Sequence, residues 1–593
     1  MTNKQSRPEL HPAVTFIKKH YYLLLIVIPL VVFSASLRNG FVYLDDDILV
    51  LDNQAKITHL KDLGNIFHSD AFLNNTSPYY RPMLNVSLML DAQVAGTSPG
   101  FYHFMSLLLH ILCCLGLFWL LQLLGLSREK SFAGALIFAV HPVMASAVFW
   151  IPARGDLLAA LFGILFLASG IRFSQSRKPA WLILSVFAFS IALFSKESAV
   201  VLPFLLGLYL LLTRQVRWQS LLLFCGPVLV TAGWFYLRSI SVRNIGAEQM
   251  GFASIIKNLP FPFEILSRFF VPFFLPVVPV FSVLFTLAGI VVFLSIPVWF
   301  IFSKTRSGNL FLFGTFWFLA FLLPNMFVWL VTSPDSYEYL VHRAYFPLAG
   351  LLVMILALVP DRIVNFGDHR VTVVFAILIL VLSVASVAQG MKYRDAPSFW
   401  NSAIRDNPSR AWYYHFLGRY YFKQQDYVNF EHYTRLAIAR KADPRFLYNL
   451  GLVSFLGKKE YDTANVYFLR ARAQGLNEPE ANKNYFDFCV ESARNYFEKG
   501  EYRKAVDRCM TGVQVNPTNA IATYNLGLYL AYAGETKSAA TWWYRTLLLD
   551  PQLKETYLSL YYYYLNNTTL SDSVSYYAGE YRKRGGVLET PVK

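Results

Sequence analysis

The sequence predicts an all-α protein in two parts: a polytopic membrane helix bundle of about eleven spans, followed by an α-solenoid of helical repeats. Three observations support this. Of its 593 residues, 55% are hydrophobic and only 15% are charged, which is unusual for a soluble protein. Apolar stretches of membrane-helix character recur up to about residue 390. From about residue 400, small and aromatic residues recur at the spacing of paired helices.

Each predicted span is an apolar run bounded by charged or turn-forming residues. The stretch 239–274 contains Pro260, Pro262 and Pro272, so we expect an interfacial or re-entrant segment there instead of a span. The predicted spans are 20–37, 101–125, 131–150, 157–171, 180–195, 198–213, 218–237, 275–302, 309–331, 344–360 and 371–390.

The loops on one side of these spans are basic, and the positive-inside rule places that side in the cytoplasm. Residues 1–19 then form a cytoplasmic tail, and 20–37 form an uncleaved signal anchor. With an odd number of spans, residues 391–593 lie on the exoplasmic side. We expect a bacterial inner membrane with periplasmic or exterior repeats, or an ER membrane with lumenal repeats. The basic residues are Lys18, Lys19, Arg128, Lys130, Arg172, Arg177, Lys178, Arg214, Arg217, Lys304, Arg306, Arg362 and Arg370.

The C-terminal region repeats with a period of about 34 residues, which is typical of tetratricopeptide helix pairs. Small residues let the two helices of a pair approach, and a proline ends the second helix. Such stacks bind peptides or proteins on a concave surface. Cys489 and Cys509 fall at facing positions within one predicted repeat. They either form a disulfide or are ordinary core residues. The packing positions of two repeats are Cys489, Ala493, Tyr496, Ala505, Cys509 and Pro517, then Leu526, Gly527, Ala539, Trp543 and Pro551.

Composition also excludes some classes of protein. The net charge of +16 is spread over short loops and forms no basic stripe, which argues against nucleic-acid binding. Five cysteines provide neither a zinc ribbon nor a disulfide framework.

The residues able to do chemistry gather on the predicted exoplasmic side, which indicates a site at that interface. Asp45, Asp46 and Asp47 directly follow the first span. They are either a solvated cap or a general base whose acidic neighbours raise its proton affinity. Asp45 and Asp46 are also the candidate ligands if the site holds a divalent cation such as Mg²⁺ or Mn²⁺.

Two arginines at this interface are candidate phosphate ligands, each with a simpler alternative. Arg81 offers a planar fork between Tyr80 and Pro82, or it extends to lipid headgroups. Arg154 faces an anion, or it pairs with Asp156.

Lys196 and Glu197 join two spans almost without a loop, so they form an ion pair at the interface or contact a phosphate. His342 and Arg343 follow the ninth span on the same side. Three other histidines are expected in the core, with the third marking a bend before a proline: His103, His110 and His141.

These motifs, taken in order, resemble the transmembrane and tetratricopeptide-repeat O-mannosyltransferases and their bacterial relatives. The similarity covers nearly the whole chain in order, which makes it more specific than any single motif. The segments that carry it are 40–47 with Asn53, 80–82, 141–159, 196–203, 342–350 and 393–400.

The resemblance implies a GT-C glycosyltransferase domain over 20–390 that uses a polyprenyl-phosphate-linked sugar. Its first outer loop, 38–100, would supply the catalytic base, here Asp45 or Asp46. This chain has Met144 and Ser146 where relatives often show a His and a Glu. With a phosphate-linked donor, we expect the phosphate ligands to be Arg81, Arg154, Lys196 and Arg343. The supporting residues are Asp47, Tyr80, His141, Asp156, Glu197 and His342.

We therefore expect an inverting enzyme that moves a sugar from a polyprenyl phosphate to a protein Ser or Thr hydroxyl on the exoplasmic side. Lipid-linked donors suit a compartment without nucleotide sugars, and the repeats would present an exported acceptor protein. Two alternatives stay open. The sugar or oligosaccharide is transferred to a glycan, lipid or pilin-like subunit, or the protein is a non-catalytic assembly factor that docks a secreted partner.

Overall fold

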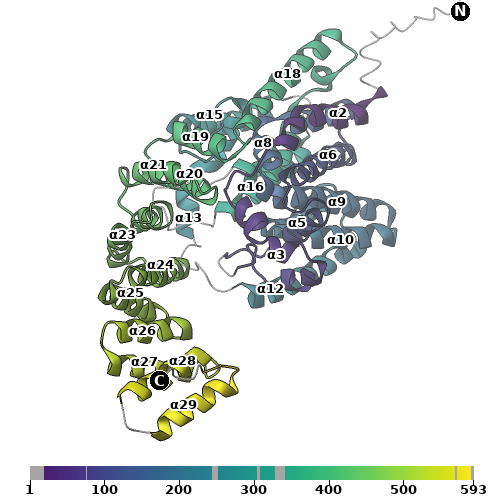
Figure 1. The fold of residues 1–593 in the computed structure, drawn as a ribbon. Coiled ribbons are helices and arrows are strands. Elements are labelled where there is room, and N and C mark those ends of the chain that lie inside the picture. The colour runs from purple at the N-terminus through teal and green to yellow at the C-terminus, as the bar shows by residue number, and fades with distance from the viewer. Residues whose placement is uncertain are drawn as a thin grey trace, which may run out of the picture. The chain divides into compact units, whose positions relative to one another are not determined.

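The computed structural model describes residues 19–74, 77–242, 252–303, 307–326, 341–567 and 571–588, and its regular elements there are all helical. The chain divides into two compact units, Met1–Leu417 and Gly418–Lys593 (Figure 1). The first is the membrane unit and the second the repeat unit. Helix α19 (Ala396–Asp406) belongs to the membrane unit, where Trp400 donates a hydrogen bond to Val42 O.

Among the described residues of the membrane unit, seven helices are long and apolar enough to cross a membrane. In four of them the α-helix is joined to a short 3-10 turn. The spans are Tyr21–Arg38, which contains α2 (Tyr21–Phe33); α6 (Pro99–Leu123); Ile151–Ser176, which contains α9 (Arg154–Ser176); Trp218–Ser241, which contains α12 (Leu222–Ser241); α15 (Val283–Phe302); Val341–Leu358, which contains α17 (Tyr345–Leu358); and α18 (His369–Met391).

The other predicted spans are shorter or bent. Helices α7 (Arg128–Val140) and α8 (Pro142–Phe149) pass the same test together but are bent by 57°. Pro142 causes the predicted bend, because a residue before proline, here His141, prefers extended backbone. Three shorter apolar helices match the remaining spans: α10 (Pro179–Ser195), Glu197–Leu212, which includes α11 (Leu202–Leu212), and α16 (Gly308–Met326). Residues 327–331 of the predicted span 309–331 lie outside the described residues.

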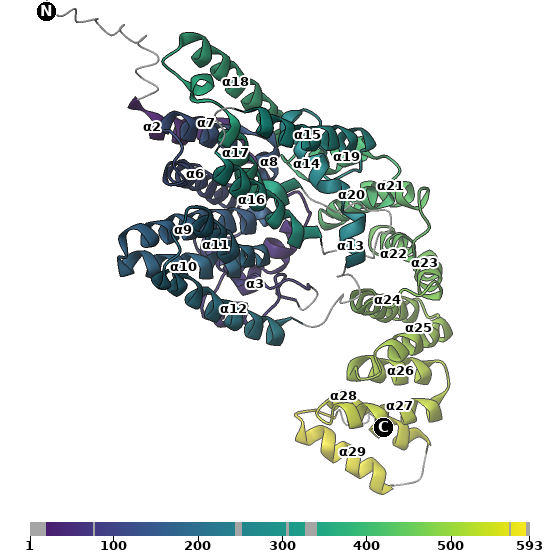
Figure 2. The ribbon, with the colours of Figure 1, turned by 180° about the vertical axis from the view of Figure 1, so that it is seen from behind.

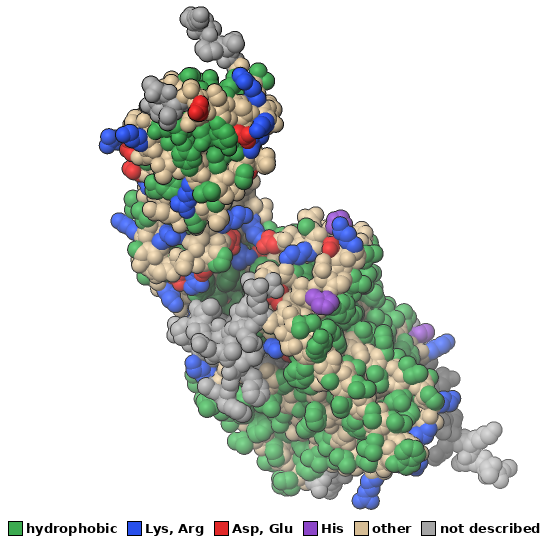
Figure 3. Space-filling model, turned by 90° about the horizontal axis from the view of Figure 1, so that it is seen from below, with side chains coloured by type: hydrophobic (Ala, Val, Ile, Leu, Met, Phe, Trp, Pro, Cys, Tyr) green, Lys and Arg blue, Asp and Glu red, His purple; other side chains and the backbone are tan. Residues whose placement is uncertain are grey.

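The surface of the membrane unit is that of a protein in lipid. Only 6% of the apolar window in α15 is buried, and its large exposed side chains are Leu, Val, Ile, Phe and Trp299. Figure 3 shows a large face dominated by hydrophobic side chains with few charged ones. The chain is a multi-pass integral membrane protein.

Some helices of this unit approach closely because glycine lies at the contact. A Cβ on Gly314 of α16 would lie 2.4 Å from Met354 N of α17, and one on Gly350 would lie 2.7 Å from Trp317 Cβ. The segment after α12 contains α13 (Phe252–Lys257) and α14 (Pro260–Phe270), two helices too short to span a membrane, as the prolines predicted. The segment between α2 and α6 contains the short helices Asp47–Asp52, α3 (Gln54–Ile57), α4 (Leu63–Phe67) and α5 (Pro82–Ala95).

The repeat unit continues from α20 (Ala411–Lys423) as pairs of helices (Figure 2). The predicted packing positions form its core: Ala493, Ala505 and Cys509 are buried in one cluster, and a Cβ on Gly527 would meet Trp543 at 2.5 Å. Cys489 and Cys509 are buried free thiols, so packing is their role here. The helices are α21 (Tyr427–Ile438), α22 (Pro444–Leu452), α23 (Tyr461–Ala473), α24 (Pro479–Glu498), α25 (Tyr502–Val515), α26 (Ala520–Tyr532), α27 (Thr536–Leu549), α28 (Lys554–Asn567) and α29 (Ser571–Lys583).

Candidate active site

The acidic segment after α2 is a tight, strained turn. Tyr43 and Asp45 both have positive φ, 59° and 70°, although neither is glycine. Left-handed backbone costs energy in a non-glycine residue and persists where the surrounding structure imposes it. Asp46 supplies part of that constraint, because its carboxylate accepts hydrogen bonds from Val42 N at 2.7 Å, Asp47 N at 3.0 Å and Leu44 N at 3.1 Å.

The three aspartates therefore have different environments. Asp47 is fully buried as the first residue of a short helix, and Asp46 is 2% exposed. Burial, opposed by the hydrogen bond from Val42 N, raises the pKa of Asp46 to about 8. Asp46 is therefore a buried side chain that supports the turn through its hydrogen bonds. Asp45 is only partly buried, so it is the acid of this segment that a substrate can reach.

Two tryptophans from distant segments hold this turn in place. Trp150 donates its indole N–H to Leu44 O at 2.8 Å, and Trp400 donates to Val42 O at 3.0 Å. A small void of about 10 Å³ beside Trp150 is also lined by Leu44, Ser146 and His342, and it is about the size of one water molecule. The turn that carries Asp45 is therefore anchored next to the rest of the candidate site.

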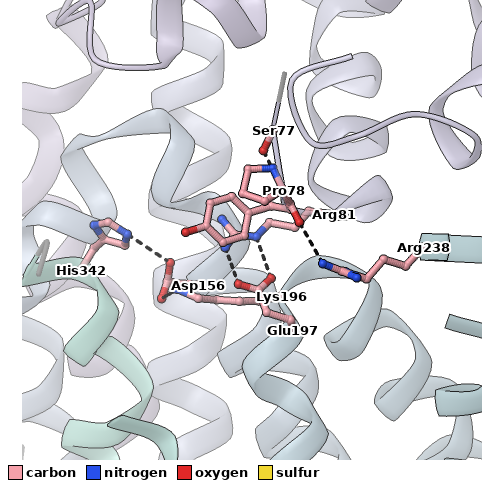
Figure 4. A network of polar contacts seen from close by, with 9 residues as sticks. Ser77, Pro78, Arg81, Asp156, Lys196, Glu197, Arg238 and His342 are labelled. Atoms are coloured by element: carbon pink, nitrogen blue, oxygen red, sulfur yellow. Dashed lines mark hydrogen bonds and ion pairs between the residues drawn. The ribbon is translucent and has the colours of Figure 1, made fainter. Parts of the chain in front are cut away.

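Arg81 forms a two-pronged ion pair with Glu197, with Nε to Oε2 at 2.9 Å and Nη2 to Oε1 at 2.5 Å (Figure 4). Its guanidinium also lies over the Tyr79 ring, 4.3 Å from the centroid. Burial lowers the pKa of Arg81, but the Glu197 charge outweighs burial and raises it, so the arginine stays protonated. The side chains are 20% and 31% exposed, which leaves this pair open to a ligand.

A second cluster lies beside this pair. Lys196 Nζ contacts Asp156 Oδ1 at 2.5 Å, and His342 Nε2 is 3.8 Å from Asp156 Oδ2 (Figure 4). The His342 ring lies 4.8 Å from the Trp150 ring, which links the cluster to the anchored turn. All three polar residues are buried. Arg343 is partly buried and belongs to the same short turn as His342.

Arg154 pairs neither with Asp156 nor with an open anion site. It forms an ion pair with Asp91 of α5 and donates to Tyr102 O at 2.6 Å, and the side chains of Arg154 and Asp91 are 1% and 2% exposed. An arginine that is buried and already paired is poorly placed to bind a donor phosphate. The sequence analysis did not identify Asp91, although a single acidic residue within an apolar helix indicates a buried partner.

The remaining candidates pack in the core. His110 bonds Tyr345 OH at 2.7 Å and Ala139 O at 3.0 Å, and His103 is buried near Gly40 O. His141 stacks on the ring of Phe269 and bonds its carbonyl oxygen at 2.9 Å, as expected for core histidines. Tyr80 and Met144 are also buried. The Tyr80 hydroxyl donates a hydrogen bond to Phe67 O at 2.8 Å, and Met144 lies on α8.

The described residues do not fit a divalent cation at this site. Across the described part of the chain, no three His, Cys, Asp or Glu side chains come together as a metal site. Asp46, one of the two candidate ligands, already uses both carboxylate oxygens for backbone N–H groups. We therefore derive no step through a metal.

Comparisons with known proteins match part of the membrane unit. Residues 78–235 match the family described as dolichyl-phosphate-mannose-protein mannosyltransferase, a stretch that contains Arg81, Asp156, Lys196 and Glu197. Mouse protein O-mannosyl-transferase TMTC1 is 30% identical over 185 residues, which cover 28% of this chain and 19% of that protein. Human TMTC4 is 28% identical over 199 residues, which cover 29% and 27%. The chain thus matches only about a fifth to a quarter of the length of these relatives.

Among solved structures, YrrB, titled a TPR protein with an unusual peptide-binding site, is 21% identical with a TM-score of 0.22. The match covers 32% of this chain and 91% of that one. MamA is 18% identical with a TM-score of 0.22, covering 27% and 84%. The chain is a multi-pass membrane protein with a C-terminal helical-repeat unit, and its membrane unit resembles the O-mannosyltransferases of the TMTC group and the wider mannosyltransferase family.

Proposed function

We propose that this protein transfers a sugar from a polyprenyl phosphate to a Ser or Thr hydroxyl of a protein on the exoplasmic side of the membrane. The main observation behind the proposal is the partly exposed Arg81–Glu197 ion pair, which lies beside the Lys196–Asp156–His342 cluster. A guanidinium that already makes two parallel hydrogen bonds to a carboxylate has the geometry that a phosphate needs. The likeness of residues 78–235 to dolichyl-phosphate-mannose enzymes supports the same donor class, with mannose as the first sugar to test.

The proposed reaction is a single in-line displacement. The acceptor hydroxyl oxygen attacks the anomeric carbon, while the bond from that carbon to the phosphate oxygen breaks and polyprenyl phosphate leaves with the electron pair. Asp45 takes the hydroxyl proton as general base. Arg81 and Lys196 stabilise the negative charge that grows on the leaving phosphate. Attack from the face opposite the phosphate inverts the anomeric configuration.

Two further features bear on the proposed substrates. Ser146 lines the void beside Trp150 and His342, at a position where relatives often show a Glu. A neutral serine there removes one charge near the proposed donor site, so the sugar preference is open to change. The repeat unit, as a stack of helix pairs, is the proposed docking surface for the acceptor protein.

Arg81→Ala should weaken binding of a polyprenyl-phosphate sugar by about 1.5–3 kcal/mol, because it removes a charge-assisted contact. The measurement is binding of polyprenyl-phosphate mannose to the purified full-length protein. Arg394→Ala is the matched control, since Arg394 is also an arginine predicted on the exoplasmic side, but it is exposed and forms an ion pair with its neighbour Asp395. Unchanged donor affinity in Arg81→Ala would count against the transferase and favour the assembly-factor alternative.

The proposed orientation makes a separate prediction. A cysteine at Ser176, at the end of α9, should react with an impermeant thiol reagent only from the cytoplasmic side. A cysteine at Ser409, after α19, should react only from the opposite side; both positions are exposed. The test is labelling of intact and of permeabilised cells or inverted vesicles. Labelling of both positions from one side contradicts the topology and with it the exoplasmic site.

A further inference from the structure

A large apolar groove lies away from the candidate active site, between α7, α14, α17 and α18. Its volume is about 900 Å³, and its lining includes Phe269, Phe273, Leu352, Phe375 and Leu378. Helix α7 contacts both α17 and α18, and the three helices can be followed in Figure 2. The apolar surface is accessible, since Phe273 is 56% and Leu378 is 42% exposed.

The groove has a charged end. Arg362 and Arg370 line it near the start of α18, and both are exposed. Neither forms an ion pair with another residue in the described ranges, whereas the neighbouring Asp361 pairs with Lys130. Asp368 also lines this end, but its side chain caps the start of α18 by accepting from Arg370 N. Two guanidinium groups at the N-terminus of a long helix favour an anion.

The depth of the groove matches one leaflet. Helix α18 lines it from Arg370 to Leu382, about 12 residues or ~18 Å at the rise of an α-helix. Half of a bilayer's hydrocarbon core is ~15 Å thick. If a lipid headgroup lies at the arginines, its acyl chains can follow the apolar lining and end near the membrane midplane.

We infer that this groove binds an anionic phospholipid, with its phosphate at Arg362 and Arg370 and its acyl chains between α17 and α18. The arginines belong to the basic loops that the positive-inside rule places in the cytoplasm, so the lipid comes from that leaflet. The donor phosphate proposed above binds at Arg81, a different cation. The groove is thus a lipid site separate from the reaction, and it stays defined even if the transferase proposal fails.

The test uses the purified full-length protein with two photoactivatable lipids that carry the same diazirine acyl chain, phosphatidylglycerol and phosphatidylcholine. Cross-linked peptides are mapped by mass spectrometry. We expect adducts within 352–382, about tenfold more from phosphatidylglycerol, because the arginines select the charged headgroup. The Arg362→Gln/Arg370→Gln variant should lose that preference. The control Lys178→Gln/Arg214→Gln, which removes two exposed charges outside the groove lining, should keep it.

A second variant separates occupancy from folding. Val374→Trp adds bulk to a lining residue that is 68% exposed, so it should reduce adducts from both lipids without changing the melting temperature. Equal labelling by the two lipids overturns the proposal. A second result would also overturn it. If a photoactivatable polyprenyl phosphate labels the groove, displaces phosphatidylglycerol and requires Arg81, the groove is part of the donor site.

Discussion

Asp45→Asn should reduce sugar transfer by ~10²–10⁴-fold, the usual effect of removing one well-placed general base. The amide keeps the size of the side chain but cannot accept the hydroxyl proton. Expression, membrane insertion and donor binding should stay unchanged, because Arg81 and Lys196 bind the phosphate in the proposed mechanism. The measurement is transfer of labelled sugar from polyprenyl-phosphate mannose to a Ser/Thr-rich peptide by the purified protein.

Asp46→Asn is the informative partner variant. Asp46 accepts three backbone hydrogen bonds, so an amide nitrogen in place of one oxygen disrupts the turn. This variant should therefore lose thermal stability together with activity, whereas Asp45→Asn should lose activity alone. If Asp45→Asn keeps activity within a few-fold of the parent protein, the acidic segment is a cap and the proposed base is wrong.

Arg154→Gln should destabilise the membrane unit by about 3–5 kcal/mol, because it leaves the buried Asp91 carboxylate without its cation. Asp91→Asn should have a similar effect through the orphaned Arg154. The readout is the melting temperature of the purified protein in detergent, followed by fluorescence or size-exclusion chromatography.

The double variant Arg154→Met/Asp91→Leu provides the control, since a buried ion pair replaced by apolar residues of similar volume is often tolerated. It should recover much of the stability that either single change loses. Donor binding should survive in the double variant as well. Loss of donor binding with stability restored would show that Arg154 contacts the phosphate after all.

Much of the fold could be predicted because hydropathy and periodicity are local properties. Each of the eleven predicted spans corresponds to a helix or a bent helix pair, and the bend at His141–Pro142 lies where proline chemistry predicts it. The helix pairs of the repeat unit likewise follow from small residues such as Gly527 at fixed spacing. The hydrogen bond from Trp400 to Val42 O could not be predicted, because the two residues are hundreds of positions apart in the sequence.

The candidate site was predictable as a set of residues but not as a set of contacts. Sequence alone brought Arg81, Lys196, Glu197 and Asp156 to one interface, since each lies at the end of an apolar run. It did not pair them. Neighbours in sequence suggested Lys196 with Glu197, yet the structure pairs Glu197 with Arg81, 116 residues away.

What the sequence by itself determined is therefore the membrane class, the helical repeats and the interface at which the polar residues gather. Only the tertiary structure decided which charges neutralise one another and which stay accessible: Arg154 is sealed with Asp91, whereas Arg81 and Glu197 are half-open. The physical reason is that ion pairing and desolvation depend on how distant helices pack, and helix packing is set by long-range contacts that no local pattern contains.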